Sequence, residues 1–317
     1  MSEIFLEGIL LAGRLLLKTL PFIILGVIFA EFIIALRLMD KVSFLARPIT
    51  NFAHLRRECG ASFLTAFVSP SAANAMLSGY FNRGLISKRE LFIASMINSF
   101  PSIVMEWRFM FPVLLPLLGL TGLIYFLILT IIGFLKTGLL MLVGRMILKK
   151  GEDWEIPLEA QARPPLKEAL SESIKASKDT IRRIIFWTVP SMVISCILIK
   201  AGVFDILASY LKGAASWFPI PAGGLGIIAA RFGHHIAAYT VASSLMSAGE
   251  LTSKGVILSL LVGNILTTLT SPVRHLLPYY VGIFGPRMGA ELMLLSSAIR
   301  NGIAIILVFG IALVPGF

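Results

Sequence analysis

Polar residues divide the chain into long apolar stretches, four of which lie at residues 20–35, 113–134, 184–199 and 290–313. Charged residues flank each of these runs. A helix of this length is about long enough to cross a hydrocarbon core of roughly 30 Å. The pattern therefore predicts membrane-spanning helices. A content of 57% hydrophobic and only 14% charged residues excludes an ordinary soluble domain.

Two further segments are too weakly hydrophobic or too interrupted to be simple membrane spans. Residues 60–81 are apolar at both ends but carry VSPS at residues 68–71, where the proline interrupts helix hydrogen bonding. Basic residues lie on both sides, so if basic loops face the cytoplasm the segment enters and leaves by the same face. We predict a re-entrant hairpin here and a second one at residues 221–246, with its tip at residues 233–239.

Another segment, residues 87–119, is too long for one straight span and is interrupted by NSFPS at residues 98–102. This predicts a helix broken at mid-membrane. The stretch from 84 to 119 also returns in altered form at 250–285, and costly residue types match at this one offset, which indicates an internal duplication. The matched pairs are Ser87-Lys88 with Ser253-Lys254, Asn98 with Asn264, Arg108 with Arg274, Pro112 with Pro278 and Gly119 with Gly285.

The distribution of charge predicts how the two copies are oriented. Loops of the first half are basic, whereas their counterparts in the second half are nearly uncharged. Because basic loops tend to face the cytoplasm, the second copy is predicted to have the opposite orientation in the membrane. The predicted fold is an all-α polytopic membrane protein of two inverted repeats, each with a re-entrant hairpin and a broken transmembrane helix. The repeats occupy residues 1–148 and 184–317, and 149–183 form a cytoplasmic polar connector with an amphipathic helix. We expect a multi-pass protein of the cell membrane.

These interruptions predict a polar cavity, because a bilayer tolerates non-helical backbone only where protein or water satisfies it. Exposed amides, hydroxyls and helix N-termini can hold a polar or anionic solute there. Each lone Ser or Thr can instead bond to its own helix backbone. The candidate substrate-binding residues are Ser69, Ser71, Asn74, Asn98, Ser99, Ser102, Glu106, Arg108, His234, His235, Asn264, Thr267, Thr268, Ser271, Arg274 and His275.

The ionisable candidates leave alternatives open. Arg108 and Arg274 could counter an anion, cap carbonyls of the broken helices or snorkel to an interface. Glu106 could be a proton site or an ion-pair partner of Arg108. Two more basic residues at depth, Arg231 and Arg300, favour an anionic cargo over a metal cation if they face the cavity.

A metal could be held by His234-His235, but adjacent residues on a helix point in different directions and no Asp, Glu or Cys stands beside them. A hydrogen-bonding or proton-sensitive role fits these residues and His275 better. An intramembrane hydrolase built from Ser69 and one of these histidines is a weaker alternative. We find no GxxxxGK[ST], GxSxG or HExxH motif, and therefore expect no enzyme, no resident metal and no cofactor.

The net charge of +11 does not indicate a nucleic-acid partner, because the basic residues are spread through loops beside apolar spans. The expected partners are the lipid bilayer and a small-molecule solute. Homo-oligomerisation and the coupling ion, H⁺ or Na⁺, stay open. The sequence favours a secondary transporter for a small polar or anionic solute. The alternatives are a divalent metal ion permease and a non-transporting membrane scaffold or sensor.

Short motifs resemble a known family. The hairpin FVSPSAANAM and the stretches RFMFPVLL and RHLLPYYV resemble the Gate, or nucleoside-recognition, family, whose domain occurs in bacterial ferrous-iron transporters and in concentrative nucleoside transporters. The resemblance implies inverted repeats, hairpins and mid-membrane sites. The iron transporters carry cysteines at places where Ser69 and Ser271 or its neighbours stand here, and a GTPase domain that this chain lacks, which argues against iron transport.

Overall fold

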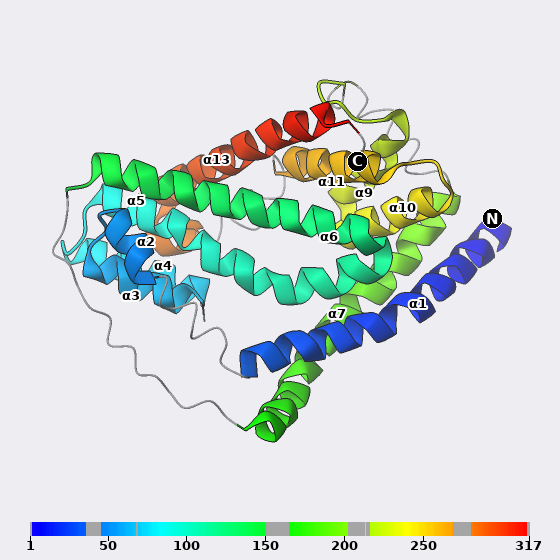
Figure 1. The fold of residues 1–317 in the computed structure, drawn as a ribbon, viewed down its shortest axis with the longest axis horizontal. Coiled ribbons are helices and arrows are strands. Elements are labelled where there is room, and N and C mark those ends of the chain that lie inside the picture. The colour runs from blue at the N-terminus through cyan, green and yellow to red at the C-terminus, as the bar shows by residue number, and fades with distance from the viewer. Residues whose placement is uncertain are drawn as a thin grey trace.

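A computed structural model describes residues 2–35, 46–67, 69–149, 165–201, 213, 216–268 and 280–315. Every regular element in these ranges is helical, which confirms the all-α prediction for this part of the chain (Figure 1). The elements are α1 Ser2–Ala35, α2 Ala46–Phe52, α3 Arg57–Ala66, α4 Pro70–Asn82, α5 Lys88–Ile97, α6 Ser99–Ile147, α7 Leu166–Lys200, the 3₁₀ turn η2 Ala222–Gly224, α9 Leu225–Gly233, α10 His235–Ser247, α11 Ser253–Thr267 and α13 Pro286–Leu313.

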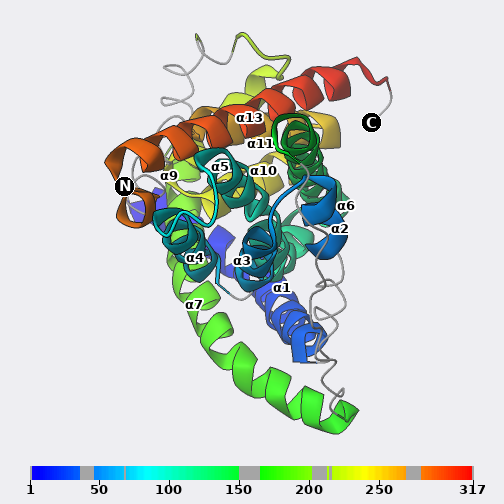
Figure 2. The same cartoon turned by 90° about the vertical axis from the view of Figure 1, so that its left-hand side faces the viewer.

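The long helices α1 and α7 pack against each other along one side of the molecule (Figures 1 and 2). The start of α1 meets the end of α7: a Cβ atom on Gly8 would lie 2.7 Å from Ile197 Cα, and Lys200 Nζ lies 3.0 Å from Glu7 Oε2. The pair is therefore antiparallel. In α7 the predicted amphipathic helix and the following span form one continuous helix.

Two pairs of consecutive helices pack against each other within the segments for which the sequence predicts re-entrant hairpins. The first is α3 with α4, and Ser69 caps α4 by accepting a bond from the Ala72 amide at 3.2 Å. The second is α9 with α10, where His234 Nδ1 accepts from the Ile236 amide at 3.2 Å. A capping side chain thus stands at the same place in each hairpin, and α4 and α10 both contain 13 residues.

The broken helices are interrupted less than expected. Only Asn98 separates α5 from α6, and α6 resumes at Ser99 because Pro101 falls in its first turn, where the missing N–H is not needed. In the second half α11 runs past Asn264 to Thr267. The stretch that follows, residues 269–279, lies outside the described residues.

Two matched glycines begin corresponding helical segments. Gly119, inside α6, has φ 56° and ψ −133°. Figure 1 shows that α6 folds back on itself, and Lys136 of its second arm bonds Ser99 of its first. Gly285, with φ 81°, immediately precedes α13. Such positive φ values favour glycine. Residues 120–147 of α6 and 286–313 of α13 are each 28 long, so the sequence match corresponds to a shared backbone role.

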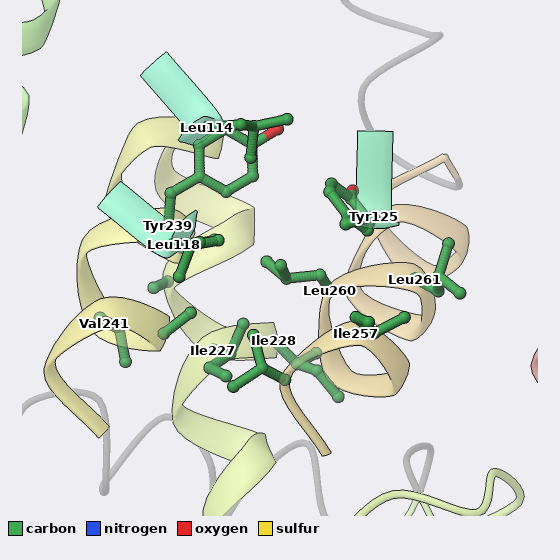
Figure 3. Packing of buried hydrophobic residues seen from close by; sticks show 14 of the residues in the cluster. Leu114, Leu118, Tyr125, Ile227, Ile228, Tyr239, Val241, Ile257, Leu260 and Leu261 are labelled. Carbon is green, nitrogen blue, oxygen red and sulfur yellow. The ribbon is translucent and has the colours of Figure 1, made fainter. Parts of the chain in front are cut away.

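The core that supports these elements is apolar and closely packed. Tyr125 of α6 and Tyr239 of α10 pack edge to face at 6.2 Å. Figure 3 shows them beside aliphatic residues of α6, α9, α10 and α11, namely Leu114, Leu118, Ile227, Ile228, Val241, Ile257, Leu260 and Leu261. Two described segments are long and apolar enough to cross a bilayer, Phe109–Ile147 and Pro286–Leu313.

Candidate substrate-binding cavity

A cavity of about 640 Å³ lies among both hairpins, α5, α6, α11 and α13. Its volume falls in the range typical of small-molecule sites. Polar and apolar side chains share its surface. The lining residues are Pro70, Asn74, Ser95, Asn98, Ser99, Ile103, Trp107, Met110, Phe126, Leu129, Thr130, Ile132, Gly133, Lys136, Arg231, Asn264, Thr267, Thr268, Tyr280, Ser296, Ser297 and Arg300.

The first half contributes a network of buried amides and hydroxyls. Asn98 Nδ2 donates to Ser62 Oγ at 2.6 Å, and this hydroxyl donates to the carbonyl of Ala73 at 3.2 Å. Ser95 Oγ donates to Asn74 Oδ1 at 3.0 Å. These bonds tie α5 and the α5–α6 junction to both arms of the first hairpin. They hold the amide groups in fixed positions at the cavity wall.

The second half makes a comparable connection with a different side chain. Arg231, near the end of α9, donates to Asn264 Oδ1 at 3.2 Å. In both halves the matched asparagine therefore bonds a side chain of the first hairpin arm. Thr267 and Thr268 donate to backbone carbonyls of their own helix, at 2.8 and 2.7 Å, as the alternative interpretation of lone hydroxyls anticipated.

Lys136 joins the two halves at the cavity and was missed by the sequence reasoning. It lies in the second arm of α6 with 4% exposure. Its ammonium donates to Ser99 Oγ at 3.1 Å and to Ser296 Oγ of α13 at 2.7 Å. A charged residue in the middle of an apolar run is itself a signal of function, and this one could have been found on that ground.

The cavity is positively charged. Lys136, Arg231 and Arg300 line it, and none of its described lining residues is acidic. Within the described ranges no three His, Cys, Asp or Glu side chains gather where they could hold a metal ion. Lys136 is buried, whereas Arg231 and Arg300 are partly exposed. Cations gathered in a cavity with hydrogen-bond donors around them form a site suited to an anion.

Not every predicted residue faces this cavity. Six of them line it, namely Asn74, Asn98, Ser99, Asn264, Thr267 and Thr268. Ser69, His234 and His235 are absent from its lining, and the first two cap helices instead. The side chains of Ser71, Ser102, Glu106 and Arg108, and the whole of Ser271, Arg274 and His275, lie outside the part that the structure describes.

Long apolar helices around a cavity that polar side chains partly line are consistent with a membrane protein. Residues 16–119 match the model of the Gate family, described as nucleoside recognition. The uncharacterized protein MJ1556 of Methanocaldococcus jannaschii is 32% identical over 306 residues, covering 95% of this chain and 96% of that protein. The uncharacterized protein MJ0871 of the same organism is 28% identical over 302 residues, 92% of each chain. The chain belongs to the Gate family. No solved structure matches it.

Proposed function

We propose that this protein is a secondary transporter that carries a small polar or anionic solute, such as a nucleoside or an organic or lipid phosphate, by alternating access. The observation that carries the proposal is the cavity. Both halves of the chain contribute polar groups to it, and its described lining includes three basic side chains and no acidic one. Fixed cations and amides can bind a negatively charged group while the apolar helices isolate it from lipid.

Corresponding features of the two halves support inverted repeats. The Gate match ends at Gly119, whose counterpart Gly285 has the same role. Lys88 at the start of α5 pairs with Glu291 near the start of α13 at 2.7 Å, whereas Lys254 at the start of α11 donates to Ala312 and Val314 carbonyls at its end. The matched lysines thus lie at opposite ends of α13. Repeats of opposite orientation allow alternating access by rocking about a shared site.

The two alternatives have less support. A divalent metal permease would place its cargo beside three like charges, which repel it. A scaffold or sensor needs no polar cavity between its halves, and buried polar groups cost stability unless they are satisfied or used.

Uptake by purified protein in liposomes tests the proposal. We expect uptake of a member of a panel of nucleosides, organic anions and lipid phosphates. We further expect Lys136→Met to lower uptake at least tenfold, because a hydrogen bond to a charged group contributes roughly 1.5–3 kcal/mol. Lys175→Met is the matched control, since this exposed lysine of α7 is remote from the cavity lining and should leave uptake unchanged. Equal loss in both variants, or uptake of no compound, would refute the proposal.

A further inference from the structure

The two arms of α6 form an apolar wall on one side of the cavity. Ser99 of the first arm is hydrogen-bonded to Lys136 of the second. One turn on, a Cβ atom at Gly133 would lie 2.7 Å from Ile103 Cδ1. Two turns on, Trp107 packs edge to face against Phe126 at 5.8 Å. The arms therefore run side by side. We call the height of Lys136 and Ser99 along them the charged level, and the height of Trp107 and Phe126 the aromatic level.

The distance between these two levels is comparable to the length of a small organic molecule. Eight residues separate Ser99 from Trp107, which corresponds to about 12 Å along a helix. Met110 and Leu129 extend the apolar surface. An inorganic oxyanion bound at Lys136 would leave this wall uncovered, and a cavity of about 640 Å³ would hold it together with many waters.

The charged level is reinforced by α13. Ser296 accepts the second bond of Lys136, and Arg300 follows it by four residues on the same face of that helix. At the aromatic level the indole Nε1 of Trp107 is buried and has no hydrogen-bond partner within the described ranges. A buried donor without a partner is costly, so it marks a place where a ligand can accept a hydrogen bond.

We infer that the solute is an amphipathic organic anion, whose acid group lies at Lys136, Ser296 and Arg300 and whose aromatic or apolar body lies along the α6 wall against Trp107 and Phe126. The inference rests on the proposed function and adds a class and an orientation to it. A carboxylate or phosphate monoester would satisfy the charged level. A ring or alkyl chain would cover the wall and exclude water from it, and a polar atom on that body would accept a hydrogen bond from the Trp107 indole.

A series with one head group and different bodies tests the inference. Inorganic phosphate, methyl phosphate, phenyl phosphate and decyl phosphate are titrated into the full-length protein in detergent by calorimetry and compete for uptake in liposomes. We expect phenyl or decyl phosphate to bind at least about tenfold more tightly than methyl phosphate, because burying apolar area is favourable. Preference for decyl phosphate assigns the solute to lipids, and preference for phenyl phosphate assigns it to water-soluble aromatic acids; either supports the inference.

Variants separate the two levels. Trp107→Leu should reduce the phenyl-over-methyl preference at least about fivefold while leaving methyl phosphate affinity within about twofold. Lys136→Met should weaken all four compounds alike. Trp217→Leu, at a residue 81% exposed, is the matched control and should change neither. Thermal unfolding and gel filtration confirm that each variant is folded; if Trp107→Leu fails this check, Leu129→Asn replaces it with the same expected loss of preference.

The outcomes distinguish the inference from the function on which it rests. Equal affinity for methyl, phenyl and decyl phosphate, sensitive to Lys136→Met, would overturn the amphipathic class and keep the anion transporter. Preference that survives the wall substitution in a folded variant would overturn the orientation. If none of the phosphates binds and only an uncharged panel compound is transported, the acid group at Lys136 is wrong; if nothing is bound or transported, the proposed function fails.

Discussion

Lys136 is the residue whose position is hardest to explain by stability alone. A buried ammonium loses its hydration, and two serine hydroxyls replace it only in part. Replacing it by a methionine of similar length removes that cost. We therefore predict that Lys136→Met raises the free energy of unfolding of the ligand-free protein by about 1 kcal/mol or more, measured by thermal unfolding in detergent. A variant that lost stability together with uptake would make Lys136 a structural residue.

Asn98 has the opposite role, because its side chain connects elements. Its amide donates to Ser62, which in turn donates to Ala73. Removing the amide leaves the Ser62 oxygen without this donor, so Asn98→Ala should lower the free energy of unfolding by about 1–3 kcal/mol. The exposed Asn82 at the end of α4 provides the control, and Asn82→Ala should change it by less than about 0.5 kcal/mol.

The two asparagines also test the site itself. The double variant Asn98→Ala with Asn264→Ala removes the matched amide from each half at once. Uptake in liposomes should fall at least about tenfold, since each lost hydrogen bond contributes roughly 1 kcal/mol and the wall geometry depends on both. Unchanged uptake by a folded double variant would count against this cavity as the path of the solute.

At the scale of the element, Gly119 is the residue at which α6 divides into two arms. Its φ of 56° and ψ of −133° reverse the chain so that the two arms can pack, and open space surrounds the position where a Cβ would stand. Gly119→Ala should therefore cost only backbone strain, about 1–3 kcal/mol. Gly138→Ala, at a helical glycine that also faces open space, should instead be neutral or stabilising by up to about 1 kcal/mol. Thermal unfolding of the two variants measures the difference.

Elements and breaks were predictable from sequence where local chemistry dictates them. Pro70 after Ser69 marks the start of α4, and the matched Gly119 and Gly285 mark reversals or helix starts, because proline and positive-φ glycine act on their own backbone. The pairing of Lys136 with Ser99 and Ser296 could not be read in the same way. It depends on how α6 folds back and how α13 packs, which are long-range contacts without a local signal.

At the scale of the whole molecule, the two halves line one cavity, but the starts of the matched helices α5 and α11 lie at opposite ends of α13. The helix α13 contains 28 residues, about 42 Å in length, which exceeds a hydrocarbon core of roughly 30 Å. Lys88 is fixed at its start and Lys254 at its end. If α13 spans the membrane, these two ends face opposite compartments.

Cysteine labelling of intact cells with a membrane-impermeant maleimide tests this topology. Arg89→Cys and Glu250→Cys introduce thiols at exposed neighbours of the two lysines, and the native Cys59 and Cys196 are buried and should react little. We expect one of the two variants to label in intact cells and the other only after permeabilisation. Arg287→Cys, at the start of α13, should label like Arg89→Cys. Labelling of Arg89→Cys and Glu250→Cys from the same side would exclude inverted repeats, and with them the symmetry on which alternating access depends.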